Sequence, residues 1–338
     1  MTTIIPVASG KGGVGKTVFT ANLGVSLARQ GKTVILADLD LGGSNLHTCL
    51  GVTNSSSGIG NYIFNQTERL ETLVIETREP RLFFIPGDSL LPGTANLPYF
   101  RKVKILKELA ALVADYVILD LGSGSSFNTV DFFLSSNTGV IVTTPETTAV
   151  LNAYSFLKTA LYRLIFRSFP AKSEERARIR DFISQSIEGT ALTFEVLVQE
   201  IASIRAVSGQ IARKHLDEFR PRVVLNMVRG QADLPLGDKL REIAEKNLSI
   251  RLEYAGVLPT DPTVPRSIYE RQPTASVHPE APYAQGVAQV ATRISGSSEQ
   301  HVLRLHEDDE ELLAPVEQEL HVPEVPEIGG GPASPYEI

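Results

Sequence analysis

The most informative stretch of this 338-residue chain is a glycine-rich loop, Gly10-Lys11-Gly12-Gly13-Val14-Gly15-Lys16-Thr17, with Val18 directly after it. An apolar run over residues 4–8 precedes the loop, and apolar residues at helical spacing follow it as far as Gly31. The spacing G-x-x-x-x-G-K-[ST] between a strand and a helix predicts a phosphate-binding loop, because glycines let backbone N–H groups approach phosphate oxygens at a helix N-terminus. A glycine-rich turn without a ligand is the alternative, and the flanking strand and helix argue against it.

Two side chains of the loop have predicted roles. We expect Lys16 to reach the β- and γ-phosphates of a nucleotide. We expect the Thr17 hydroxyl to contact Mg²⁺, an ion that keeps several waters and takes few protein ligands. The loop therefore predicts a nucleotide-hydrolysing enzyme that uses Mg²⁺.

The first 150 residues alternate short apolar runs with helical patterns, which predicts a mostly parallel, twisted α/β sheet with helices on both faces. With 42% hydrophobic residues, the chain can bury a full core. Pro6 conflicts with its place in a central strand, because it lacks the N–H that a ladder needs. Between 150 and 219 we expect two or three helices, with a break at Phe169-Pro170. The predicted strands are residues 4–8, 33–37, 82–85, 116–119, 139–142, 222–225 and 254–258.

The charge of the chain is unevenly distributed. Residues 298–338 contain eleven Asp or Glu and one Arg, so their net charge is −10. The net charge of the whole chain is −7, which leaves +3 for residues 1–297. We predict a nucleotide-binding domain over residues 1–297, with a helical insertion at about 155–219, and a disordered acidic tail over 298–338. A lone cysteine, Cys49, excludes a cysteine metal cluster. Because no apolar run is long enough to cross a bilayer, we expect a cytoplasmic protein.

Carboxylates follow two of the predicted strands. Asp38 and Asp40 come at the end of the second strand, and Asp120 closes the strand over 116–119. Because the carboxyl ends of parallel strands meet at one sheet edge, we expect all three near the phosphates, where Asp120 is a metal contact. The alternatives are a solvated Asp-rich turn for the first pair and a helix N-cap for Asp120.

The loop over residues 9–17 resembles the deviant Walker A loop of the MinD/ParA ATPases, because a lysine, Lys11, directly follows its first glycine. Residues 38–46, 115–122 and 223–227 are similar, in the same order, to that family's first switch, Walker B strand and adenine-reading strand. The overall sequence pattern of the chain is most similar to the flagellar-placement branch of the family (FlhG/FleN). The resemblance covers about residues 1–150 and 222–294.

The resemblance implies a role for each matching residue. It implies that Lys11 crosses to a partner's ATP in a homodimer, that Asp40 orients the attacking water, and that Asp38 lies in the outer shell of Mg²⁺. It also implies that Asn226 reads the adenine edge and that Pro259 flanks the base. Asn226 as an ordinary turn residue is the alternative. Residues 144–146 resemble a dimer-facing segment of the same family.

As function we predict an ATP-dependent dimerising switch that controls placement in a bacterial cell, such as flagellar position or the division site, with a regulatory protein bound through residues 155–219. A DNA-partitioning ATPase is the alternative, and its support is a basic cluster (Arg163, Arg167, Lys172, Arg176, Arg178 and Arg180). The basic C-terminal amphipathic helix of typical MinD proteins is missing. Peripheral contact at the inner face of the plasma membrane would therefore use the basic cluster with Phe166 and Phe169, although a solvated helix face is the alternative for this cluster. A metallochaperone relative would need paired cysteines.

Overall fold

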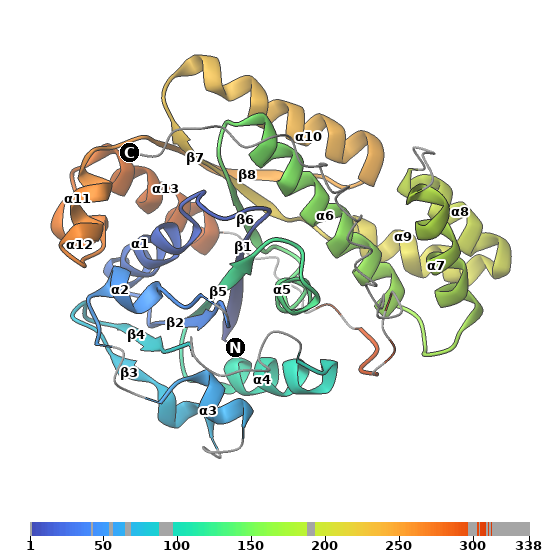
Figure 1. The fold of residues 1–338 in the computed structure, drawn as a ribbon, viewed down its shortest axis with the longest axis horizontal. Coiled ribbons are helices and arrows are strands. Elements are labelled where there is room, and N and C mark those ends of the chain that lie inside the picture. The colour runs from blue at the N-terminus through green and yellow to red at the C-terminus, as the bar shows by residue number, and fades with distance from the viewer. Residues whose placement is uncertain are drawn as a thin grey trace, which may run out of the picture.

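The computed structural model describes residues 2–41, 43–53, 57–64, 69–87, 97–187 and 193–296, and seven residues beyond them: 303, 305–308, 310 and 312. An eight-stranded sheet with the order β3-β4-β2-β5-β1-β6-β7-β8 forms its centre (Figure 1). All neighbouring strands are parallel except β3, which runs antiparallel to β4. The strands are β1 (Thr3–Ser9), β2 (Val34–Leu39), β3 (Ile75–Glu76), β4 (Leu82–Ile85), β5 (Tyr116–Ser123), β6 (Val140–Thr143), β7 (Arg222–Val228) and β8 (Glu253–Pro259).

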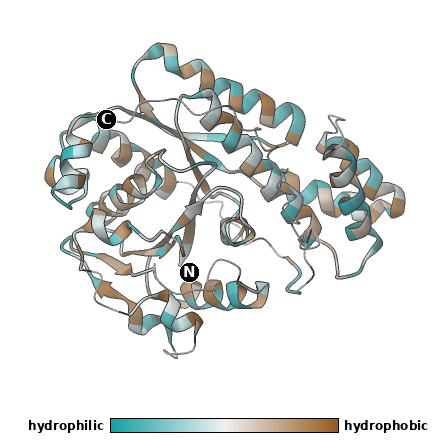
Figure 2. Ribbon diagram, in the orientation of Figure 1, coloured by the Kyte–Doolittle hydropathy of each residue, from teal (hydrophilic) through white to brown (hydrophobic). Residues whose placement is uncertain are grey.

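Helices cover both faces of this sheet, as the apolar runs predict. Alternate side chains of β5 belong to opposite layers: Ile118 packs with α1 and α13, whereas Val117 and Leu119 pack with α5 and α6. The strands are accordingly apolar on both faces, while the outer helices mix polar and apolar residues (Figure 2). The helices are α1 (Lys16–Arg29), α2 (Leu46–Leu50), α3 (Ile59–Ile63), α4 (Tyr99–Ala111), α5 (Phe127–Phe133), α6 (Thr147–Arg167), α7 (Glu174–Ile187), α8 (Phe194–Ile204), α9 (Ala206–Glu218), α10 (Leu234–Leu248), α11 (Thr263–Tyr269), α12 (Thr274–Val277) and α13 (Pro282–Gly296).

All seven predicted strands are confirmed, and the structure accounts for Pro6. Pro6 pairs with Leu119 of β5 on one side, and the ladder between β1 and β6 begins only at Val7. The proline therefore lies beyond the end of the second ladder, where its missing N–H removes no pairing. The two-residue strand β3 is too short to show periodicity in the sequence.

The described residues between 150 and 219 form four helices, so the prediction of two or three is wrong. α6 packs beside α5 and α10, while α7, α8 and α9 extend away from the sheet (Figure 1). The predicted break at Phe169-Pro170 separates α6 from α7. The missed break is at Arg205, an extended residue between α8 and α9 with no glycine or proline beside it.

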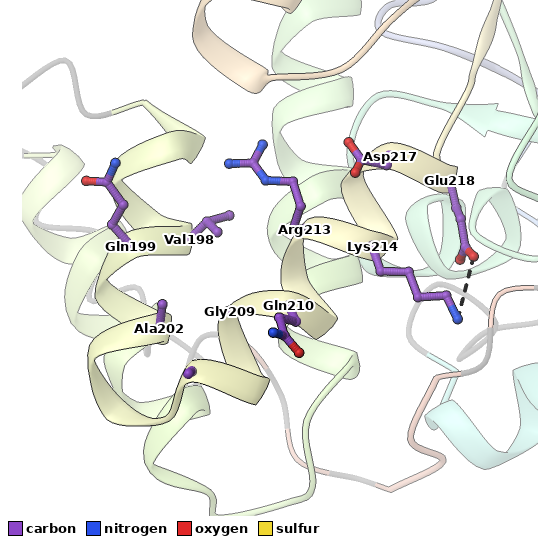
Figure 3. A pocket seen from close by; sticks show the side chains of 10 residues that line it. Val198, Gln199, Ala202, Gly209, Gln210, Arg213, Lys214, Asp217 and Glu218 are labelled. Atoms are coloured by element: carbon purple, nitrogen blue, oxygen red, sulfur yellow. Dashed lines mark ion pairs between the residues drawn. The ribbon is translucent and has the colours of Figure 1, made fainter.

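α8 and α9 pack closely at one point and leave a groove of about 570 Å³ between them (Figure 3). At the close point, a Cβ on Gly209 would lie 2.5 Å from the Cβ of Ala202, so a larger residue would push the helices apart. Farther along, Val198, Arg213 and Lys214 line the groove. No described helix is both long and apolar enough to span a membrane.

The basic cluster between Arg163 and Arg180 is not the solvated surface that its composition suggests. Arg163, Arg167 and Arg176 are fully buried, as are Phe166 and Phe169. Acidic side chains from elsewhere in the chain pair with the three buried arginines. The interpretations as a solvated helix face, and as a membrane contact through these phenylalanines, are therefore wrong for the buried residues, and the sequence support for DNA binding is weakened.

The structure describes seven residues of the predicted tail, and acidic side chains among them pair with α4, α6 and α7. None of these seven residues is helical. Leu303 and Leu312 are buried, with exposed fractions of 8% and 3%. The rest of the predicted tail, residues 298–302, 304, 309, 311 and 313–338, lies outside the described residues.

Candidate nucleotide site

The glycine-rich loop joins the end of β1 to the first residue of α1, at the carboxyl edge of the parallel strands. Gly13 and Gly15 have φ of 82°, a conformation that favours glycine. A Cβ on Gly10 would lie 2.2 Å from the backbone carbon of Asn152 in α6, and one on Gly15 would lie 2.5 Å from Nδ2 of Asn226. The loop thus brings its backbone against both α6 and β7, which only glycine permits.

Lys16 and Asp120 form a buried ion pair beneath the loop. Nζ of Lys16 lies 2.7 Å from Oδ1 of Asp120, and the hydroxyl of Thr20 donates to the same oxygen at 3.1 Å. The exposed fractions of the two charged side chains are 7% and 1%. Oδ2 of Asp120 is buried and has no hydrogen-bond partner within the described part of the chain. This carboxylate therefore retains acceptor capacity that a phosphate-bound cation or its water would use.

Asp38 lies beside Asp120, because the two residues are partners in the β2–β5 ladder. Its carboxylate accepts hydrogen bonds from the Ser44 hydroxyl at 2.6 Å and from the backbone N–H groups of Leu46 at 3.1 Å and Asp40 at 3.2 Å. Burial, with the nearby charge of Asp120, raises the pKa of Asp38 to about 7. Two neighbouring carboxylates in a dry site are costly, so the site favours a bound cation or proton.

Asp40 lies just after the end of β2 and is half-buried. A Cβ on Gly122 would lie 3.4 Å from Oδ1 of Asp40, which places this carboxylate against the backbone that follows Asp120. The structure therefore brings Asp38, Asp40 and Asp120 to one sheet edge, as the sequence predicts. It also shows that their surroundings differ, since Asp38 is buried and Asp40 is not.

Lys11 is held within its own chain. Its Nζ lies 2.9 Å from Oε2 of Glu146 and 3.4 Å from the hydroxyl of Thr148, at the start of α6. The exposed fractions of the Lys11 and Glu146 side chains are 33% and 57%, so water screens this pair. The sequence places Glu146 in a dimer-facing segment but does not identify it as the partner of Lys11.

Asn226 ends the buried part of β7 and contacts the loop directly. Its Nδ2 donates to the carbonyl oxygen of Val14 at 2.8 Å, and its buried Oδ1 has no hydrogen-bond partner among the described residues. The next residue, Met227, has φ of 59° and is 41% exposed. Pro259 lies at the end of β8, paired with Val228, so it borders the same region. An unpaired acceptor at this position fits a ligand that carries an amino group.

Thr17, the remaining predicted ligand, lies in the first turn of α1, with its hydroxyl 3.4 Å from Nζ of Lys16. Three contributors were not predicted. Thr20 and Ser44 hold the two buried carboxylates, and Thr148 supports Lys11. Thr20 was detectable, because it lies one helical turn after Lys16.

Known proteins match this chain over most of its length. Residues 5–274 match the CobQ/CobB/MinD/ParA nucleotide binding domain. The flagellum site-determining protein YlxH of Helicobacter pylori is 32% identical over 213 residues, which are 60% of this chain and 67% of that protein. The chloroplastic septum site-determining minD homolog of Arabidopsis thaliana is 34% identical over 155 residues, which are 44% of this chain and 48% of that protein. The chain thus spans about half the length of this second relative.

Solved structures share the fold. The septum site-determining protein MinD of Pyrococcus horikoshii, solved with Mg-ADP, superposes with a TM-score of 0.59 and 22% identity, over 88% of this chain and 97% of that chain. At this identity the likeness shows a common fold, a mostly parallel sheet flanked by helices.

Proposed function

Because this chain belongs to the CobQ/CobB/MinD/ParA family of nucleotide-binding domains, we propose that it is a Mg²⁺-dependent ATPase whose dimerisation is switched by ATP. The observation that supports this most directly is the buried pair of Lys16 and Asp120 under a glycine loop, with a buried carboxylate oxygen that has no hydrogen-bond partner among the described residues. ATPases of this family supply the precedent for the reaction. The structure supplies the residues that would carry it out here.

Lys16 would exchange partners when ATP binds. Its ammonium group moves from Asp120 to the β- and γ-phosphates, so no charge is left buried without a partner at either stage. Asp120 and the Thr17 hydroxyl would then be available to hold Mg²⁺. When bound, Mg²⁺ would supply positive charge that neutralises charge developing on the phosphates. Asp38 would lie in the outer shell of the ion, and the ion's charge would lower the raised pKa of Asp38.

Asp40 is suited to orienting the attacking water. It is half-buried, lies against Gly122, and has no ion-pair partner among the residues that the structure describes. A carboxylate that is anchored to the sheet edge but not consumed by a salt bridge can accept a hydrogen bond from water. Asn226 would accept from the adenine amino group through Oδ1, with Pro259 beside the base.

Lys11 would act across the dimer. To reach a partner's nucleotide it must leave Glu146, and a screened surface pair of this kind is worth about 0–1 kcal/mol. The pair therefore holds Lys11 in the monomer without preventing its release. We propose that ATP binding, by adding negative charge at the interface, shifts Lys11 from Glu146 to the phosphates of the other protomer.

The output we propose is placement of a structure in a bacterial cell, by analogy with the flagellum and septum site-determining relatives. We place the protein in the cytoplasm, with a regulatory protein bound to the α7–α9 region, whose groove lies away from the nucleotide site (Figures 1 and 3). Flagellar number and septum position in a deletion strain distinguish placement of the flagellum from placement of the septum. A strain with normal flagella and normal septa would contradict both.

Dimerisation tests the switch. Light scattering after size exclusion should show a dimer for the wild-type chain with Mg-ATP and a monomer for Lys11→Ala, with Lys246→Ala on exposed α10 as the matched control. Lys11→Ala should still bind a fluorescent ATP analogue, because Lys16 is untouched. Equal dimerisation of Lys11→Ala and the control would show that Lys11 does not cross.

A further inference from the structure

Seven residues beyond α13 form a docked segment, which comprises Leu303, Leu305, His306, Glu307, Asp308, Glu310 and Leu312. Its two N-terminal leucines lie beside α4 and α5, where they line a cavity of about 380 Å³ together with Tyr99, Leu106 and Leu134. These leucines are two positions apart, the spacing that places side chains on one side of an extended chain. The apolar half of the docked segment is therefore held by burial.

The acidic half of the docked segment is held by three arginines. Arg176 donates to both carboxylate oxygens of Asp308 at 2.6 Å and to Glu310 at 3.0 Å. Arg167 lies 3.3 Å from Asp308, and Arg180 also pairs with Glu310. Asp308 and Glu310 are again two positions apart. Forked arginine–carboxylate pairs of this kind are among the strong and geometrically selective contacts in proteins.

Backbone contacts fix the register of the docked segment. The N–H of His306 donates to the carbonyl oxygen of Arg167 at 2.8 Å, and the N–H of Lys172 donates to Glu310 at 2.6 Å. The side chain of Glu307 pairs with the exposed Lys107 of α4 at 2.9 Å. The docked segment is therefore held by both main-chain and side-chain contacts, as in the recognition of an extended peptide.

Burial makes this surface unusual. Arg176 is fully buried, and both carboxylates paired with it in the described structure come from the docked segment. Without the segment, this cation on α7 would lose both of these carboxylates. A buried charge needs a partner, so the surface is built to receive a segment with two carboxylates two residues apart.

We propose that α4, α6 and α7 form a binding site for an extended, acidic, leucine-containing peptide segment, and that the docked segment is its occupant within the same chain. The short connection from Gly296 keeps this occupant at a high effective concentration, so an added peptide of the same sequence competes poorly with it. The site does not include the nucleotide-binding residues.

The test uses the full-length chain and a fluorescein-labelled peptide copy of residues 301–314. Asp308→Lys/Glu310→Lys should release the docked segment and expose the site. Fluorescence anisotropy should then show the peptide binding this variant at least tenfold more tightly than the wild-type chain. Glu317→Lys/Glu319→Lys changes the net charge equally outside the docked segment and should bind no better than wild type.

Two further measurements keep the outcome decisive. If the charge reversal unfolds the chain, Asp308→Asn/Glu310→Gln replaces it, with weaker but detectable peptide binding expected. Adding Arg180→Glu should abolish binding, and amides in α7 should exchange hydrogen several-fold faster in the released variant than in wild type. The proposal is overturned if the released variant binds the peptide no more tightly than the charge control. It is also overturned if α7 exchange is unchanged, or if nucleotide-free wild type is a dimer that exchanges segments between chains.

Discussion

Replacement of Asp120 by alanine should destabilise the nucleotide-free chain strongly. Asp120 is fully buried, and its partner Lys16 retains only 7% of its side-chain exposure at a distance of 2.7 Å. Removal of one partner from a buried ion pair leaves the other charge uncompensated, which costs about 3–5 kcal/mol. At roughly 2–4 °C per kcal/mol, the melting temperature should fall by about 6–20 °C.

The assay is thermal unfolding by circular dichroism in EDTA, without nucleotide. Asp40→Ala is the matched control, because Asp40 belongs to the same sheet edge but is half-buried and lacks an ion pair within the described structure. Its change should stay within about 1 kcal/mol. Saturating ADP supplies negative charge to Lys16, so it should raise the melting temperature of Asp120→Ala at least as much as that of wild type. Equal melting temperatures for Asp120→Ala and Asp40→Ala without nucleotide would refute the reasoning.

Three further substitutions test separate contacts. Glu146→Gln frees Lys11 from a screened pair worth at most about 1 kcal/mol in each protomer. Because two such pairs break for each homodimer formed, ATP-dependent dimerisation should tighten by up to roughly thirtyfold in sedimentation velocity, and weaker dimerisation would count against the restraint. Burial raises the pKa of Asp38 to about 7, so the folded chain binds this proton more tightly than the unfolded chain and loses stability as pH rises from about 4 to 7. Asp38→Asn should therefore gain melting temperature relative to wild type between pH 5 and pH 8, and a pH-independent difference would contradict the shift. Asp131→Ala leaves two buried cations on α4 and α6 without their shared carboxylate, which should cost about 3–5 kcal/mol in urea unfolding; a loss below about 1 kcal/mol would show that the cluster relaxes.

The nucleotide site was predictable because its elements are local and ordered. The loop spacing, the strand-end aspartates and the parallel topology together place Asp38, Asp40 and Asp120 at one edge, and the structure confirms that placement. What periodicity cannot supply is the environment of each carboxylate. Asp38 and Asp40 look equivalent in the sequence. In the structure, however, Asp38 is buried and accepts hydrogen bonds from Ser44 and the Leu46 N–H, whereas Asp40 is half-buried.

The error about the basic cluster concerns partners that are distant in sequence. Arg163 finds Asp131 across 32 positions, and Arg176 finds Asp308 across 132, so composition alone made both look like solvated charges. The docked segment has the same explanation. The low apolar content of residues 298–338 predicts disorder, and it gives no sign of the distant surface on which Leu303 and Leu312 are buried. The break at Arg205 was missed because tertiary packing of α8 on α9, and not a glycine or proline, ends the helix there.

Phosphate release from Mg-ATP by the full-length chain tests the proposed ATPase most directly. Wild type should release phosphate at a steady rate that EDTA abolishes, and Asp40→Ala should fall to background while it still binds a fluorescent ATP analogue. Asp238→Ala, on the exposed face of α10, should match wild type. An undiminished rate in Asp40→Ala, or no Mg²⁺-dependent release by wild type, would contradict the account.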